Sequence, residues 1–313
     1  MQNCTQQKEL YRKYKSGGPR AASPGSSWHN YASAIDLTIY KDGVYDDGRN
    51  GVSNYTGLAR AAFSSYGLIN DIPNDIDSII HLAAISDIKF CNENPKECYQ
   101  TNVDGTLNML ELSRKLDAKF LFMSTSHVYG YPKKLPIPEN HPTESTSIYA
   151  TSKLVSEKIC ESYSKLYGLD ISIIRLFSTY GPFEPNYKVT SEIISQLLVN
   201  DTITLGNIHP KRDFVYVDDV IRAMDVIIKK SKGFDIFNVG TGKSYSILEI
   251  SKMLSKLMNK KLLIKSNSTK IRNNEISNVV ADCSKIKKLG WMPKITLLNG
   301  LKLTLNWHIN KKQ

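Results

Sequence analysis

The chain has 313 residues, of which 41% are hydrophobic and 23% are charged, and this composition is ordinary for a globular protein with a sizeable core. Its net charge is +11, but the lysines are scattered and not interleaved with aromatic residues, so a nucleic-acid partner is not expected. Five dispersed cysteines favour a reducing cytoplasm and no metal site, and no run reaches the ~18 apolar residues of a membrane span. We therefore expect a cytoplasmic protein that has no membrane partner.

The composition of the chain changes at about residue 66. Before this point Gly, Ser, Asn, Tyr and charged residues dominate, and the periodicity of apolar residues is weak. The best candidate strand in this part is "AIDLTIY" at 34–40. We expect residues 1–65 to form an atypical N-terminal segment.

From residue 66 to about 180, apolar strands alternate with helices. Short apolar runs bounded by polar residues are typical of buried parallel strands, and three occur: "DSIIHLA" (77–83), "KFLFMST" (119–125) and "DISIIRLF" (170–177). Between them the sequence predicts helices over 94–117 and 147–168, the second ending at Gly168. This order predicts an α/β fold with a doubly wound parallel sheet, whose ligands lie beyond the carboxyl ends of the strands.

Beyond residue 180 the pattern is looser. It contains a predicted helix near 189–199, the segment "FVYVDDVIRAMDVIIKK" and a basic helical tail. We expect residues 181–313 to form mainly a smaller C-terminal lobe, with some segments returning to the sheet.

Tyr149 and Lys153 form the pattern Y-x-x-x-K on the predicted helix 147–168. Residues four apart leave the same face of a helix. An ammonium beside a phenol stabilises the phenolate and lowers the pKa of the tyrosine from about 10. Tyr149 is therefore a candidate general acid or base, although Tyr and Lys also fall four apart by chance on solvated helix faces.

A hydroxyl-rich segment, "STSHVYG" at 124–130, follows the predicted strand 119–125. The hydroxyls of Ser124, Thr125 and Ser126 are therefore expected at the carboxyl edge of the sheet, where a ligand lies. A hydroxyl there can hydrogen-bond a substrate alcohol or carbonyl. In isolation the segment would equally suit a simple Ser/Thr-rich turn.

Together these motifs resemble the extended short-chain dehydrogenase/reductases of the NAD-dependent epimerase/dehydratase family, which act on nucleotide sugars. The resemblance covers roughly residues 66–305 and rests on several segments in order. They are "HLAA" (81–84), "TNVDGTLNMLE" (101–111), "STSHVYG", "LPIPENHPTESTSIYATSK" (135–153), "RLFSTYGP" (175–182), "RDFVYVDDV" (212–220), "FNVGTGKSYSILEI" (237–250) and "ADCSKIKKLGWMPK" (281–294). It implies a Rossmann-like domain over 66–180 and a substrate-binding lobe over 181–313.

The resemblance also implies roles for individual residues. Tyr149 would be the catalytic base, Lys153 its pKa partner and a ribose anchor, and Thr125 the hydroxyl that orients the sugar. The residues that would flank the NAD cofactor are His81, Ala83 and Asn102. Ser126 and Ser178 would lie by the sugar, and Arg212 and Arg272 match positions that contact the nucleotide phosphates, a task suited to a planar guanidinium.

Two departures from the family pattern bear on the reaction. In 4,6-dehydratases of the family, the residues after the active threonine are usually Asp-Glu, an acid/base pair for eliminating water. Here they are Ser126 and His127, so dehydration lacks its expected groups. Ser178 stands where an asparagine usually contacts the sugar, which leaves the identity of the sugar open.

The largest departure lies at the front of the chain. The family begins with a strand and G-x-x-G-x-x-G, whose glycines let the backbone approach the cofactor pyrophosphate. In "KSGGPRAASPGSS" (15–27) the glycine spacing differs, prolines intervene, and the preceding "KELYRKYK" is polar. Asp46, in "VYDDGRNGVSNYTGL" (44–58), resembles the acid that holds the adenosine ribose and would favour NAD over NADP by repelling a 2′-phosphate.

The sequence thus predicts an NAD-dependent nucleotide-sugar epimerase, which by resemblance is a homodimer. A reductase, dehydratase or decarboxylase on the same scaffold remains an alternative. So does a non-catalytic nucleotide- or RNA-binding protein that has lost its cofactor turn. A third alternative is that the first ~60 residues are not a selected N-terminus, which would leave them disordered or misfitted.

Overall fold

The computed structural model describes residues 37–41, 44–45, 76–267 and 275–310, which all belong to one compact unit, Ile35–Gln313. Asp46, Arg272 and the glycine-rich stretch 15–27 lie outside the described residues. No helix in the described ranges is long and apolar enough to cross a membrane.

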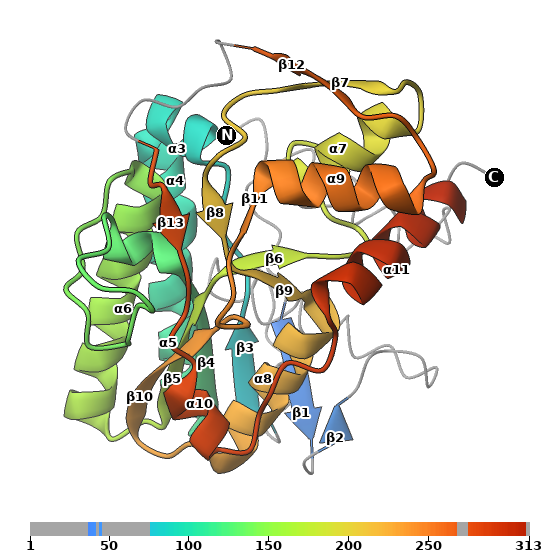
Figure 1. Cartoon of the computed structure of the whole chain (residues 1–313). Coiled ribbons are helices and arrows are strands. Elements are labelled where there is room, and N and C mark those ends of the chain that lie inside the picture. Colours follow the sequence, from blue (N-terminus) through green and yellow to red (C-terminus); the bar gives the residue numbers. More distant parts are fainter. Residues whose placement is uncertain (1–36, 42–43, 46–75, 268–274, 311–313) are drawn as a thin grey trace, which may run out of the picture. The chain divides into compact units, whose positions relative to one another are not determined.

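The main sheet has six strands in the order β10-β5-β4-β3-β1-β2 (Figure 1). Four of them run parallel: β3 (Ser78–His81), β4 (Lys119–Thr125), β5 (Ile171–Leu176) and β10 (Phe234–Val239). The three buried strands predicted from apolar runs are thereby confirmed. The late strand β10 also belongs to this sheet, whereas the division of the chain at residue 180 stays a prediction.

One edge of the sheet is antiparallel. Strand β1 (Leu37–Lys41) lies where the sequence predicts a strand, but it pairs antiparallel with β3. It also pairs antiparallel with β2 (Val44–Tyr45), with Lys41 opposite Val44. Asp42 and Gly43, which stand between these two strands in the sequence, lie outside the described residues.

Alternate residues of the parallel strands face two separate cores, as expected of a sheet covered on both faces. Ile79, Phe120 and Ile171 pack into one core with α5 (Gly105–Leu116) and α6 (Ile148–Tyr167). Ile80, Leu121 and Phe237 pack into the other core with α8 (Val217–Lys230) and α10 (Ser284–Lys288). The doubly wound α/β architecture is thereby confirmed.

The helices that frame the carboxyl edge of the sheet are locally well defined. In α6, the Ser147 side chain caps the first turn by accepting from the Ala150 amide, and Gly168 ends the helix with a φ of 71°. The predicted helix over 94–117 is divided into α4 (Pro95–Tyr99), a π-helical turn (Gln100–Asp104) and α5. The short helix α3 (Ile88–Glu93) precedes it.

A third core lies in the later part of the chain and holds the smaller sheets together. Strand β6 (Ser178–Tyr180) pairs with β9 (Phe214–Tyr216) directly after the main-sheet strand β5. The other elements of this part are α7 (Val189–Leu197), β7 (Thr202–Leu205), β8 (Lys211–Arg212), β11 (Tyr245–Ser246), α9 (Ile247–Leu257), β12 (Leu263–Ser266), β13 (Asn278–Val279) and α11 (Leu297–Asn310).

Candidate active site

The hydroxyl of Thr125 and the phenol of Tyr149 meet at the carboxyl end of β4. Thr125 is the last residue of the strand, and its side chain accepts from the His127 amide at 3.3 Å, which begins the short turn Ser126–Tyr129. Tyr149 is the second residue of α6 and is 9% exposed. A side-chain hydrogen bond joins the two groups and favours the phenolate form of Tyr149. The structure therefore brings together two of the three predicted catalytic residues.

Lys153 lies one turn further along α6 and is 2% exposed. Its ammonium donates to the backbone oxygen of Met123 at 2.8 Å and lies 4.6 Å from the centre of the Phe122 ring. The amine is thus directed at strand β4, close to the place where Thr125 meets Tyr149. An ammonium has three donors, so this bond leaves donors for a further partner.

The pKa of Tyr149 moves in the direction opposite to that expected from the sequence. Burial raises the pKa of the Tyr149 phenol to about 12, and the hydrogen bond from Thr125 only partly opposes this rise. Burial also lowers the pKa of the Lys153 amine to about 8. The expectation that Lys153 depresses the pKa of Tyr149 is therefore wrong for the protein alone, because desolvation outweighs the favourable contacts of the phenolate.

The lowered pKa of Lys153 predicts a pH-dependent contribution to stability. Between pH values of about 8 and 10.5 the folded chain has released this proton and the unfolded chain still holds it, so the unfolding free energy rises with pH. Relative to a Lys153→Met variant, the wild type should gain about 3 kcal/mol across this window. Urea unfolding of both proteins at a series of pH values measures the difference, and a pH-independent difference would refute the buried-amine assignment.

Asn102, predicted to flank the cofactor, holds the loop that follows β3. It is fully buried, its side-chain oxygen accepts from the Ile85 amide at 2.8 Å, and its amide nitrogen donates to the Ile85 carbonyl at 3.1 Å. The same nitrogen donates to the Ser152 hydroxyl at 2.8 Å. Ser152 lies between Tyr149 and Lys153 on α6 and was missed from the sequence, because nothing in its local pattern marks it. Asn102 thus links this loop to the catalytic helix.

Ser124 does not face a ligand, contrary to the expectation for the hydroxyls of this segment. Its side chain donates to the Glu157 carboxylate at 2.5 Å. Glu157 in turn pairs with the Arg175 guanidinium at 2.7 Å, and both side chains are nearly completely buried. Only the two hydroxyls that follow, on Thr125 and the half-buried Ser126, remain at the edge of the sheet.

The remaining cofactor candidates lie at the end of β3. The Nε2 atom of His81 lies 3.2 Å from the Thr106 hydroxyl, which itself donates to a backbone oxygen, so Nε2 is the donor. Burial, aided by Lys153, lowers the pKa of His81 to about 3, so the ring is neutral. Within the described part of the chain, its buried Nδ1 has no hydrogen-bond partner. Ala83 follows β3 and is buried, so it presents little bulk at this edge.

The predicted nucleotide-binding residues belong to the later part of the chain. Ser178 begins β6, half-buried, and its amide donates to the Asp213 carbonyl at 2.9 Å. Arg212, at the end of β8, donates to the Ile276 carbonyl at 2.8 Å and pairs with Glu275 at 3.4 Å. The guanidinium of Arg212 is therefore held by the segment that follows residues 268–274, and its role toward a phosphate stays a prediction.

Tyr187, which the sequence analysis missed, belongs to the same region. Its phenol hydrogen-bonds Ser86 in the loop after β3, and it lies near enough to Tyr149 for its ionised form to raise the pKa of that phenol. Burial raises the pKa of the Tyr187 phenol itself. A segment that follows β6 thus reaches the loop that Asn102 holds.

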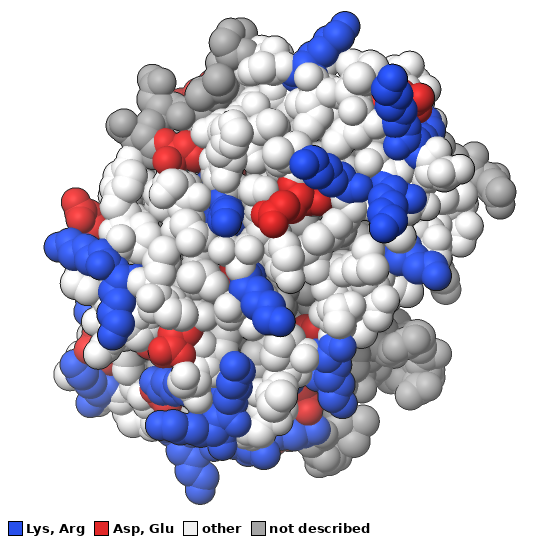
Figure 2. Space-filling model, in the orientation of Figure 1, with Lys and Arg blue, Asp and Glu red and all other residues white. Residues whose placement is uncertain are grey.

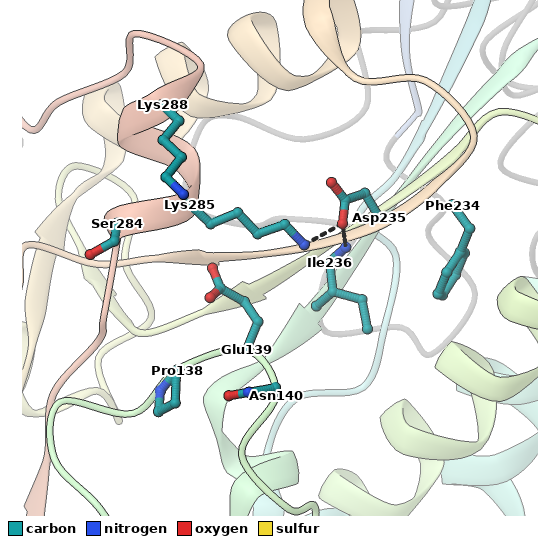
Figure 3. A pocket seen from close by; sticks show the side chains of 9 residues that line it. All are labelled: Pro138, Glu139, Asn140, Phe234, Asp235, Ile236, Ser284, Lys285 and Lys288. Atoms are coloured by element: carbon teal, nitrogen blue, oxygen red, sulfur yellow. Dashed lines mark hydrogen bonds and ion pairs between the residues drawn. The ribbon is translucent and has the colours of Figure 1, made fainter.

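A separate pocket lies at the outer edge of β10 (Figure 3) and has a volume of about 620 Å³. No predicted catalytic residue lines it. Two of its carboxylates bind outward-facing amides of this edge strand: Asp235 accepts from Ile236 at 3.0 Å, and Glu139 accepts from Asn238 at 2.9 Å. Lys285 pairs with Asp235 across the pocket. These carboxylates block the pairing of a further strand and give the pocket a structural explanation.

Comparison with known proteins places these residues in a family. The family described as GDP-mannose 4,6 dehydratase matches residues 62–304. The chain is 35% identical over 261 residues to a UDP-glucuronate 4-epimerase of Thermodesulfobacterium geofontis, covering 82% of this chain and 77% of the relative. It is 31% identical over 278 residues to UDP-glucuronic acid decarboxylase 3 of Arabidopsis thaliana, covering 85% of this chain and 79% of the relative.

The chain belongs to the NAD-dependent epimerase/dehydratase family of extended short-chain dehydrogenase/reductases. Solved structures agree. UDP-glucose 4-epimerase of Thermotoga maritima with UDP-glucose superimposes with a TM-score of 0.70 at 31% identity, over 75% of this chain and 77% of that one. UDP-glucose 4-epimerase of Thermus thermophilus in complex with NAD superimposes with a TM-score of 0.67 at 27% sequence identity, over 73% of this chain and 76% of that one. The predicted family is thereby confirmed, and its members include epimerases and decarboxylases of nucleotide sugars.

Proposed function

We propose that the chain is an NAD-dependent 4-epimerase of a uridine diphosphate sugar. The observation that carries this proposal is the hydrogen-bonded pair of Thr125 and Tyr149 at the carboxyl end of β4, with Lys153 one turn further along the helix. Ser126 and His127 follow Thr125 instead of the Asp-Glu pair of dehydratases, which favours epimerisation over loss of water. The nucleotide is taken from the relatives, several of which are named for UDP sugars.

The described residues fit the nicotinamide end of the cofactor. The Lys153 ammonium donates one bond to Met123 and keeps two donors, which suit ribose hydroxyls. The small, buried Ala83 after β3 and the backbone ends of β3 and β4 offer close approach at the edge where such ligands lie. The groups proposed for the adenosine end, Asp46 and the stretch 15–27, lie outside the described residues.

In this proposal the residues of the chain transfer a proton and hold the sugar in position. NAD, when bound, supplies reversible oxidation and reduction at C4 of the sugar. The Tyr149 phenolate takes the proton of the 4-hydroxyl and later returns it from the same oxygen. Thr125 donates a hydrogen bond to the phenolate oxygen of Tyr149 and orients the sugar, and Lys153 adds positive charge near this oxygen. Ser126 and Ser178 are proposed to contact the sugar, and Arg212 and Arg272 the phosphates.

The assembly proposed for the chain is a homodimer formed through α5 and α6. Apolar side chains of these helices are exposed in the single chain: Leu107, Val155, Leu166 and Tyr167. Nucleic acid is not proposed as a partner, because on the face drawn in Figure 2 basic side chains are spread out with acidic ones between many of them.

Product analysis tests the proposed reaction. The full chain is incubated with NAD and, in turn, UDP-glucose and UDP-glucuronate, and the products are followed by NMR and mass spectrometry. A 4-epimerase gives a product of unchanged mass with inverted configuration at C4. Loss of carbon dioxide from UDP-glucuronate would instead identify a decarboxylase, and loss of water a dehydratase; either result would replace the epimerase proposal.

A further inference from the structure

Two buried thiols lie in contact beside the proposed base. The Sγ atoms of Cys91 and Cys98 are 2.6 Å apart, and neither residue is exposed. Both are free cysteines, and together with Tyr149 they form one small buried cluster. Non-bonded carbon atoms sit ~3.5–4.0 Å apart, and a disulfide bond measures about 2.0 Å, so this contact needs only a short movement to become covalent.

The two thiols sit on short helical segments whose other residues are half-buried or exposed. Cys91 is the one buried residue of α3, which has six residues, and Cys98 is the one buried residue of α4, which has five. Asn94 alone separates the two helices, and Pro95 begins the second. Helices with so few buried contacts open locally at small cost, which gives a small reagent access to the pair.

The pair is polarised in the way that thiol chemistry requires. The hydrogen bond between the two sulfurs lowers the pKa of Cys98 to about 7 and raises the pKa of Cys91. The hydroxyl of Ser152 also lowers the pKa of Cys98. Cys98 is therefore the more readily ionised thiol of the two, and Cys91 the one that holds its proton more firmly.

We propose that Cys91 and Cys98 form a reversible disulfide, with a peroxide as oxidant, that switches the adjoining active site off. The Cys98 thiolate attacks one oxygen of hydrogen peroxide, the O–O bond breaks, and the released hydroxide takes a proton to leave as water. The Cys91 sulfur then attacks the resulting sulfenic acid, the S–O bond breaks, and a second water leaves with the Cys91 proton. Two thiols and one hydrogen peroxide thus give one disulfide and two waters.

The chemistry of a metal site fits the pair less well. Among residues 76–267 and 275–310, no group of three or more His, Cys, Asp and Glu side chains is placed to hold a metal ion.

Contacts of the pair explain how the disulfide would act on the site. The Asn102 amide nitrogen donates to the Cys98 sulfur at 3.5 Å and to the Ile85 carbonyl at 3.1 Å. The Cys91 sulfur also donates to the Ile85 carbonyl, at 3.5 Å. Drawing the sulfurs together moves α3 against α4 and disturbs the loop after β3. The proposed function places the cofactor at this loop, and the switching half of this inference rests on that placement.

Peptide mapping tests the bond without any need for activity. The reduced full chain is treated with hydrogen peroxide, free thiols are alkylated, and the protein is digested with trypsin. Cleavage after Lys89, Lys96 and Arg114 separates the two cysteines into peptides 90–96 and 97–114. The expected product is these two peptides joined with the loss of two hydrogens, and their separation by dithiothreitol. Recovery of both as separate alkylated peptides after peroxide treatment would overturn the proposal.

The effect on the site is measured on the same samples. Oxidation is expected to weaken NAD binding and turnover about tenfold, within the ~5–150-fold range of coupled sites, and dithiothreitol should restore both. A Cys91→Ala variant and a Cys98→Ala variant should resist inhibition. Cys160→Ala, which changes a buried cysteine of α6 outside the pair, should remain sensitive. A joined peptide with unchanged NAD affinity would overturn the switch, and a chain inactive even when reduced would count against the proposed function alone.

Discussion

Replacing Tyr149 by phenylalanine is expected to lower turnover of the nucleotide sugar by about 10²–10⁴-fold, the usual contribution of a positioned acid or base. The substitution removes the one oxygen that Thr125 bonds at the end of β4 and leaves the ring in its buried cluster. Binding of NAD should remain nearly intact, because the ring and Lys153 keep their places. Steady-state kinetics and NAD titration of the variant measure the two effects separately.

The pH dependence of turnover tests the same assignment. Because burial raises the pKa of Tyr149 to about 12, only a small fraction of the phenol is ionised near neutral pH. The wild-type rate should therefore rise with pH up to about 8, above which Lys153 loses its proton and with it the positive charge near the phenolate.

The matched control for Tyr149 is Tyr163→Phe, on the same helix. The phenol of Tyr163 donates to Glu111 at 2.6 Å, away from Thr125. Turnover should be unchanged by this substitution. A Tyr149→Phe enzyme with wild-type turnover would remove Tyr149 from its proposed role.

The Glu157→Gln substitution is expected to destabilise the fold by about 3–5 kcal/mol, because it leaves a buried guanidinium without its counter-charge. Arg175 and Glu157 are 5% and 3% exposed, and the Arg175 side chain makes bonds to both carboxylate oxygens. Ser124 donates to the same carboxylate, so the pair joins the ends of β4 and β5 to α6. The midpoint and slope of urea unfolding measure the loss.

The same helix offers the control for Glu157. Glu161 pairs with Lys158 and Lys165, whose side chains are largely exposed. Surface pairs contribute only about 0–1 kcal/mol, so Glu161→Gln should have little effect. Equal losses for the two variants would show that the buried pair does not organise this edge.

The parallel strands of the main sheet could be predicted because a short apolar run bounded by polar residues is typical of a strand buried on both faces. "KFLFMST" forms β4 over the residues predicted, and Gly168 ends α6 where the sequence places the stop. The direction of β1 could not be predicted. Apolar content marks a strand but not whether it runs parallel or antiparallel, and only the Asp-Gly between 41 and 44 hints at the hairpin.

The sequence predicts which residues make up the candidate site, but it does not predict their contacts. Spacing places Tyr149 and Lys153 on one face of a helix, yet it cannot tell that the ammonium reaches the Met123 carbonyl. It also cannot show that desolvation outweighs the bond from Thr125 and raises the pKa of the phenol.

The contact between Cys91 and Cys98 was beyond sequence reasoning for a similar reason. The two residues are seven apart, which matches no common thiol motif. The two side chains meet across the break between α3 and α4, which a count of residues does not reveal.

The central claim is that this chain binds a nicotinamide cofactor although its glycine-rich stretch departs from the family pattern. Titration of the full chain with NAD, followed by tryptophan fluorescence, tests this claim most directly. Saturable binding below millimolar NAD, retained in the Tyr149→Phe variant, is the predicted result. No binding at millimolar NAD would contradict the claim and would favour a family member that has lost its cofactor.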